Sequence, residues 1–137
     1  MRRQHLALVL AACFATLGGT CRSEFIGPQL FGSWGGEHIT MEIAAGGATI
    51  EYDCANGTID GFFVIDGSGR FDLTGVHVRE QGGPVQDGVP PDAHPARYVG
   101  RTDGRTMSLT VTMTDTDQVV GTFALVRGVP GQVFKCL

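Results

Sequence analysis

The sequence has no run of lysine and arginine, and this excludes several classes of partner. Its 137 residues contain 10 Lys and Arg against 14 Asp and Glu, which gives a formal net charge of −4. Loss of an N-terminal leader with Arg2 and Arg3 would make the mature chain more acidic still. An acidic chain without a basic run is not expected to bind nucleic acid or to dock electrostatically on anionic lipid.

Helical periodicity is absent after residue 20, and neither an internal repeat nor a domain break interrupts the chain. Hydrophobic residues make up 42% of the sequence and charged residues 18%, a balance that supports a packed core rather than disorder. The length suits one domain. The 21 glycines favour many tight turns over long helices.

The sequence also lacks the residue patterns of common active sites. No C-x-x-C occurs, which argues against a zinc knuckle and a thioredoxin-like redox site. Ser68 lacks the flanking pattern of a nucleophile elbow and is interpreted as a turn residue. We therefore expect neither an enzyme nor a protein that holds a cofactor. The residues that could gather a metal match no ligand signature and are interpreted as solvated or turn residues: His77, Glu80, Asp87, Asp92 and His94.

The first 20 residues have the pattern of an export signal. Arg2 and Arg3 form a charged start, and residues 6–17 are an apolar run without a charge. This run is too short for a permanent membrane span, which needs about 20 residues. We expect a signal peptide over 1–20, a tether over 21–31 and a β-barrel domain over 32–137.

Two cysteines compete to begin the mature chain. Leu10-Ala11-Ala12-Cys13 resembles the bacterial lipoprotein box, in which a leucine and small residues precede a cysteine that becomes lipidated. Cys21 follows the complete apolar segment, and its use would leave an even number of cysteines behind it. Cleavage without lipidation remains a third possibility. Cys21, or else Cys13, is the expected lipid anchor, which would place the protein in the bacterial cell envelope, periplasmic or on the outer surface, with the anchor as its only contact with the membrane.

Cys54 and Cys136 are then expected to form a disulfide, because exported proteins reside where disulfides persist. The bond would close a loop of about 80 residues and stabilise the fold by at most roughly 4.5 kcal/mol on the chain-entropy model.

Alternation of apolar and polar residues, with a period of two, predicts an all-β fold. Glycine-containing pairs separate the segments, as in hairpins: Gly46-Gly47, Asn56-Gly57, Asp66–Gly69 and Asp103-Gly104. Eight consecutive antiparallel strands most simply close into a meander barrel, since closure removes sheet edges; a two-sheet β-sandwich is the alternative. The expected strands are His38–Ile43, Ala48–Cys54, Thr58–Ile65, Arg70–Val78, Arg97–Thr102, Arg105–Met113, Val119–Arg127 and Val133–Cys136.

Gly32-Ser33-Trp34, before the first of these strands, resembles the G-x-W that opens the calycin barrels of the lipocalin and avidin type. The resemblance implies that Trp34 closes one end of the barrel. The whole chain also resembles small bacterial envelope lipoproteins, which imply no particular activity. In a closed barrel the first strand lies between the second strand, which ends at Cys54, and the last strand, which carries Cys136. The two cysteines would then be too far apart for a disulfide, so either the first strand must fray near Glu37 or the barrel must be open where the first and last strands meet.

One long irregular segment, Arg79–Ala96, is the expected binding element. The order of hairpins places it at the Trp34 end, where it would serve as a structural cover or as a binding surface. We expect a module that binds an envelope protein through this loop; the alternative is a carrier of a small apolar ligand in the barrel interior. Arg97, Arg101 and Arg105 surround one hairpin and are interpreted as a solvated face. The expected binding residues are Glu80, Gly82, Gly83, Pro84, Asp92, His94 and Arg97.

Overall fold

The computed structural model describes residues 25–26 and 30–137, with side chains from Leu30 onward. The expected signal peptide and both candidate lipidation cysteines, Cys13 and Cys21, lie outside the described residues.

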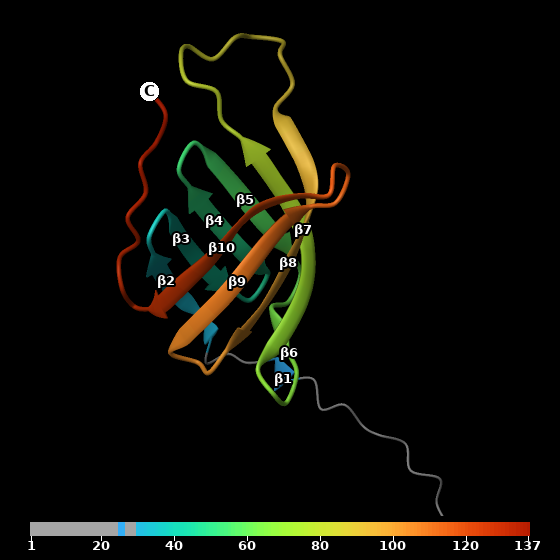
Figure 1. Cartoon of the computed structure of the whole chain (residues 1–137), viewed down its shortest axis with the longest axis vertical. Coiled ribbons are helices and arrows are strands. Elements are labelled where there is room, and N and C mark those ends of the chain that lie inside the picture. Colours follow the sequence, from blue (N-terminus) through green and yellow to red (C-terminus); the bar gives the residue numbers. More distant parts are fainter. Residues whose placement is uncertain (1–24, 27–29) are drawn as a thin grey trace, which may run out of the picture.

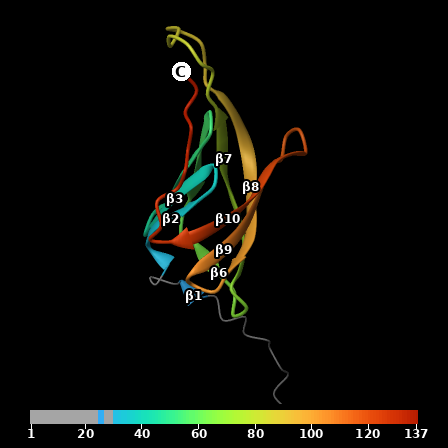
Figure 2. The same cartoon turned by 60° about the vertical axis from the view of Figure 1, so that its left-hand side comes forward.

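The described residues form a closed barrel of eight antiparallel strands, as the alternation predicted, and contain no α-helix (Figures 1 and 2). The order around the barrel is β10-β2-β3-β4-β5-β7-β8-β9, and β1 pairs with β6 in a separate two-stranded sheet. The strands are β1 Phe25–Ile26, β2 Gly32–Gly36, β3 Ile39–Ala44, β4 Gly47–Tyr52, β5 Ala55–Asp60, β6 Val64–Ile65, β7 Arg70–Arg79, β8 Asp92–Thr102, β9 Thr106–Met113 and β10 Gln118–Arg127.

The count of eight is right, but the first and last strands are not the expected ones. Gly32–Gly36 is a strand in its own right, and it turns at His38 to pair with β3. Val133–Cys136, the expected eighth strand, lies outside the barrel in a C-terminal tail, residues 128–137. The glycines of β2 explain the change, because a Cβ at Gly35 would lie 2.2 Å from the Val129 carbonyl oxygen. Bare backbone therefore lets the tail pack directly on β2.

The second predicted turn is also misplaced. Asn56-Gly57 lies inside β5, and the chain turns instead at Asp53-Cys54, where Cys54 has a φ of 52°. Gly57 is required by packing rather than by a turn, since a Cβ there would lie 2.5 Å from the Tyr98 hydroxyl. The predicted strand Thr58–Ile65 is interrupted, and its last two residues form β6.

These shifts change which segments share an end of the barrel. We call the end with the His38 turn, the Cys54 turn, residues 80–91 and the turn at 114–117 the loop end. We call the end with the β1–β6 sheet and the turns at 45–46 and 103–105 the N-terminal end. Because β2 starts at the N-terminal end, the long loop lies at the opposite end from the start of the Gly32-Ser33-Trp34 stretch (Figure 1). The expectation that the loop covers the Trp34 end is therefore wrong.

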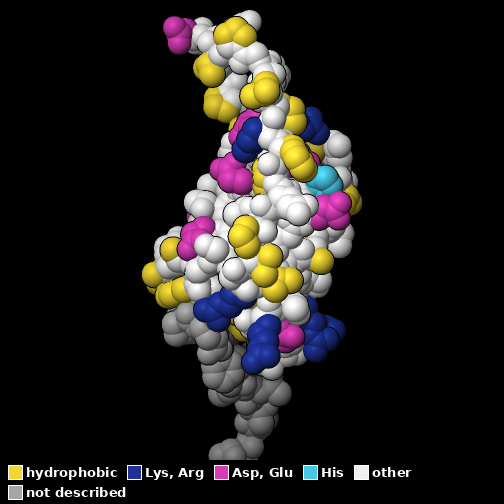
Figure 3. All heavy atoms as spheres, turned by 90° about the vertical axis from the view of Figure 1, so that its left-hand side faces the viewer, with side chains coloured by type: hydrophobic (Ala, Val, Ile, Leu, Met, Phe, Trp, Pro, Cys, Tyr) yellow, Lys and Arg dark blue, Asp and Glu magenta, His cyan; other side chains and the backbone are white. Residues whose placement is uncertain are grey.

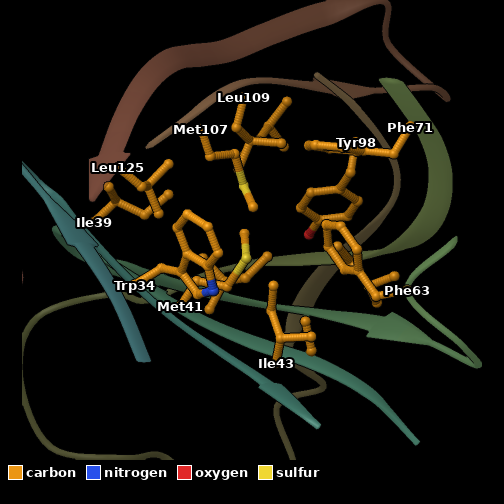
Figure 4. Packing of buried hydrophobic residues seen from close by; sticks show 14 of the residues in the cluster. Trp34, Ile39, Met41, Ile43, Phe63, Phe71, Tyr98, Met107, Leu109 and Leu125 are labelled. Carbon is orange, nitrogen blue, oxygen red and sulfur yellow. The ribbon is translucent and has the colours of Figure 1, made fainter. Parts of the chain in front are cut away.

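The barrel interior is filled by large apolar side chains. Trp34, Tyr98 and Leu109 are fully buried, and Figure 4 shows them with Met41 and other side chains pointing into the same space. The Trp34 indole Nε1 donates to the Leu30 carbonyl, 2.9 Å away, so the indole polar atom is satisfied at the N-terminal end. Leu30 is itself buried, and the pair seals this end of the core.

The predicted disulfide joins Cys54 to Cys136, with 4.8 Å between the Cα atoms. The tail reaches Cys54 by crossing the turn between β2 and β3. There the Gln132 amide donates to the Gly36 carbonyl at 2.9 Å, and the His38 amide donates to the Gln132 carbonyl at 2.8 Å. Since Cys136 lies on this crossing tail and not on a barrel strand, the bond requires neither a frayed strand nor an open seam.

Candidate functional site

The loop end carries the most exposed segment of the described chain, residues 80–91, which we call the distal loop. Every residue from 81 to 91 is exposed, and the loop projects beyond the barrel (Figures 1 and 2). Val85 is 95% exposed and Val89 64% exposed. Gly83 and Gly88 adopt φ values of 105° and 87°, a left-handed conformation that gives the loop its sharp bends. The yellow side chains at the far tip of Figure 3 belong to this loop.

Glu80, directly after β7, fixes the start of the distal loop to the barrel. Its backbone amide donates to the Cys54 carbonyl at 2.8 Å, and its carboxylate accepts from the side-chain amide Nδ2 of Asn56 at 2.9 Å. The Lys135 ammonium donates to the same carboxylate at 3.0 and 3.2 Å, and also contacts Glu51. The hydrogen bonds from Asn56 and Lys135 hold the pKa of Glu80 below its usual value. The C-terminal tail therefore braces the base of the loop.

His94 and Asp92 fix the start of β8, the strand that follows the distal loop. His94 Nδ1 lies 2.7 Å from Asp115 on the next hairpin turn, and its Nε2 lies 2.9 Å from Asp92. Chiefly because of the Asp115 hydrogen bond, the pKa of His94 is raised, and that of Asp115 is correspondingly lowered. Arg79 donates to Gln118 at 2.7 Å and lies 3.9 Å from Asp92. An exposed loop thus stands on a base that is cross-linked on both sides.

Beside this base, the mouth of the barrel holds an open pocket of about 300 Å³. Two of the residues that line it, Tyr52 and His77, each have a buried polar atom, the hydroxyl and Nδ1, without a hydrogen-bond partner among the described residues. The two rings meet edge to face, with centroids 5.2 Å apart. Burial, and then the charge of Arg79, lowers the pKa of His77, and burial raises the pKa of Tyr52. The pocket is lined by His38, Tyr52, Asp53, Cys54, Ala55, His77, Arg79, Val120 and Phe123.

The structure brings most of the sequence-predicted residues together at the loop end. Glu80 and Asp92 stand at the two feet of the loop, and Gly82, Gly83 and Pro84 form its first exposed limb. His94 belongs to β8 rather than to the loop, because β8 begins at Asp92.

Arg97 lies apart from these residues, on the outer wall of the barrel. It forms a two-pronged ion pair with Asp72, with Nε 2.7 Å from one carboxylate oxygen and the NH2 group on the other.

Sequence reasoning missed the mouth pocket and the tail that braces the loop. A signal for the pocket was present, since Phe71, Leu73, Gly75 and His77 alternate along one face of β7. A histidine on that face had to end in the interior. The bracing by Lys135 depends on the path of the tail, which no local pattern reveals.

Within residues 25–26 and 30–137, no group of three or more His, Cys, Asp or Glu side chains is arranged to hold a metal ion. The same residues contain no helix with the length and apolar character to cross a membrane. Comparisons of the chain with protein-family models, with curated proteins and with solved structures give no match.

Proposed function

We propose that this protein is an exported, lipid-anchored binding module that contacts a partner protein of the bacterial cell envelope through the distal loop. The observation that supports this most is the run of exposed residues from 81 to 91, which includes two exposed valines on a rigid base. Binding residues are often carried on loops that a rigid scaffold positions.

The composition of the loop also favours binding over a role in stability. Pro84, Pro90 and Pro91 restrict the backbone, so less conformational entropy is lost when a partner orders the loop. Val85 and Val89 contribute little to the core because they face solvent, and their burial by a partner would be favourable. These properties fit an interface with a small apolar centre.

The test is site-specific photocrosslinking in the native envelope, with a photoreactive residue at position 85. A discrete crosslinked protein should form, and its yield should fall at least tenfold when Val89 is changed to Ser. The matched control is Val126→Ser, because Val126 is a half-exposed valine on the barrel wall. Both serine variants should melt within a few degrees of the parent protein. Equal crosslinking in the two variants, or no discrete product, would contradict the proposal.

The mouth pocket supports a second candidate, the binding of a small, largely apolar ligand with one polar group. Its volume, about 300 Å³, is at the lower limit for small-molecule sites. The unpartnered Tyr52 hydroxyl and His77 Nδ1 offer hydrogen bonds that the described chain leaves unused. Native mass spectrometry of protein purified from its envelope should then show a bound small molecule. Val120→Phe, which fills the pocket, should remove it, whereas Val89→Ser should retain it.

A further inference from the structure

The N-terminal end of the barrel carries arginines that lack carboxylate partners among the described residues. Two of them do bind carbonyl oxygens: Arg101 Nε donates to the Ser68 carbonyl at 3.2 Å, and Arg127 donates to the Phe31 carbonyl at 2.9 Å. Arg70, Arg101, Arg105 and Arg127 are exposed at this end, and none forms an ion pair with a described carboxylate. Figure 3 shows dark-blue side chains gathered at this end of the face in view. By contrast, Arg79 and Arg97, elsewhere on the barrel, both have carboxylate partners.

Two of these arginines stand directly opposite each other. Arg70 on β7 and Arg101 on β8 are register partners, and both point outward. Like charges in directly opposed positions of a sheet destabilise it. Arg101 donates to the Ser68 carbonyl, but neither arginine forms an ion pair with a described carboxylate that would offset this cost in full. An external anion between the two guanidinium groups would remove that cost.

Two of the carboxylates at this end, those of Asp66 and Asp103, are engaged in their own turns. Asp66 accepts from the amides of Ser68 and Arg70, and Asp103 accepts from the amides of Arg105 and Thr106. Arginine side chains extend further from the backbone than aspartate side chains do, so the outermost charge at this end is positive. The loop end has the opposite character, with Glu37, Asp53, Glu80, Asp87, Asp92, Asp115 and Asp117 against Arg79 and Lys135.

The path of the chain ties the same end to any N-terminal anchor. β1 begins at Phe25 and pairs with β6 at the N-terminal end. Cys21 precedes Phe25 by four residues, so a lipid on Cys21 would be held within about 14 Å of this end. Phe62 lies in the connection between β5 and β6 at the same end and is 60% exposed. Exposed phenylalanines are among the side chains that proteins bound at a membrane surface bury in the boundary between headgroups and acyl chains.

We propose that the N-terminal end of the barrel docks on the anionic headgroups of the membrane that holds the lipid anchor. The four arginines bind lipid phosphates, for which planar guanidinium groups are suited, and Phe62 enters the interface. The acidic distal loop then points away from the membrane. This inference rests on the lipid anchor of the proposed function. It also reverses the expectation from overall charge, because the basic residues gather at one end only after the chain folds.

The test uses the mature lipidated protein reconstituted in phosphatidylcholine vesicles, with or without phosphatidylglycerol. A fluorophore is placed at Ser68 or at Asp87, and a nitroxide-labelled lipid serves as quencher. With phosphatidylglycerol present, quenching should be strong at position 68 and weak at 87, and added salt should weaken it. The triple variant R70Q/R101Q/R105Q should weaken quenching at position 68, because the loss of three charges should lower the apparent affinity of this end for the lipid surface by on the order of 100-fold.

Arg101→Gln and Arg97→Gln form the matched single pair, since both residues face outward on β8. Only Arg101→Gln should weaken docking, because Arg97 already has Asp72 as its partner. Quenching that is equal at the two positions, independent of phosphatidylglycerol, or unaffected by the triple variant would overturn the inference. A mature N-terminus without lipid would also overturn it. Crosslinking from position 85 reports separately on the distal loop. Neither an ineffective triple variant nor a mature N-terminus without lipid would change its outcome.

Discussion

Gly57 lies beside two tyrosines that differ in whether their hydroxyl groups are satisfied. The Tyr98 hydroxyl donates to the Val76 carbonyl at 2.7 Å, whereas the Tyr52 hydroxyl has no partner among the described residues. Burial raises the pKa of Tyr98 to about 12, so this tyrosine remains a neutral donor. The absence of a Cβ at Gly57 gives both rings their space.

The two hydroxyls should therefore have different effects on stability. Tyr98→Phe should lower the free energy of unfolding by about 1 kcal/mol, because it removes the hydrogen bond to the Val76 carbonyl. Tyr52→Phe should be neutral or slightly stabilising, because it removes a buried hydroxyl that has no bond to lose. Urea unfolding of the two variants measures this difference. A larger loss for Tyr52→Phe would mean that its hydroxyl has a partner which the structure does not show.

His94 should make the stability of the loop base depend on pH. Its pKa is raised in the folded protein, so its contribution is complete below the ordinary histidine pKa of about 6.5 and is lost as pH rises through the folded value. His77 has the opposite effect on stability. Its pKa is lowered in the folded protein, so the free energy of unfolding falls as pH falls and the unfolded chain takes up a proton at this residue.

The two effects are separated by comparing parent protein and His94→Gln. The parent should exceed the variant in thermal midpoint at about pH 5.5, and this difference should shrink by about pH 8.5. A His77→Phe variant serves as the control, since the same difference should persist when His77 is absent. A difference that grows toward high pH would contradict the assigned roles of Asp92 and Asp115.

At the scale of elements, closure depends on a short seam and on the tail that crosses it. β10 and β2 share two register pairs, Val126 with Gly35 and Arg127 with Trp34, whereas β7 and β8 pair along ten residues each. The tail adds hydrogen bonds beyond the seam, from Gly128 to the Ser33 carbonyl and between Gln132 and the β2–β3 turn. The disulfide holds the tail in that position.

The double variant Cys54→Ser/Cys136→Ser should release the tail and weaken the seam. Stability should fall by roughly 2–4 kcal/mol, within the limit of about 4.5 that the chain-entropy model sets. Hydrogen exchange should show faster exchange at the His38 and Gln132 amides, with the β7–β8 amides following only the global loss. Unchanged protection at His38 would show that the tail stays docked without the bond.

Strand periodicity was predictable, but strand boundaries were not, for identifiable reasons. Thr106–Met113 alternates cleanly, and it is a strand with its odd-numbered residues buried. Asn56-Gly57 has the composition of a turn, yet its glycine is there to accommodate Tyr98 from a distant strand. Gly35 and Gly36 likewise serve contacts with residues more than 80 positions away. A glycine required by long-range packing cannot be distinguished from a turn glycine by local pattern.

At the scale of the molecule, the strand prediction contained one error at each end of the barrel domain. Together the two errors left the number of strands correct, but they changed which end of the barrel each segment occupies. Adding β2 and removing Val133–Cys136 leaves eight strands, so the barrel class was predictable from periodicity and turn spacing. The same exchange reverses which end carries the beginning of the chain. It therefore separates the distal loop from the N-terminus, and the separation of charge between the two ends follows from it.

A single continuous core runs through the whole barrel, from Leu30 at the N-terminal end to Tyr52 near the mouth, so the barrel should unfold in one step. Calorimetry should show one transition whose calorimetric and van't Hoff enthalpies agree, at about 75 kcal/mol for a domain of roughly 110 residues near 60 °C. Replacement of residues 84–89 by a Gly-Ser segment of equal length should leave the midpoint within a few degrees, because no residue from 81 to 91 is buried. The double cysteine variant should retain one transition at a lower temperature, since the tail lies outside the core. Two resolved transitions in the parent protein would show that the ends of the barrel fold independently, and a large loss on loop replacement would assign the distal loop a structural role.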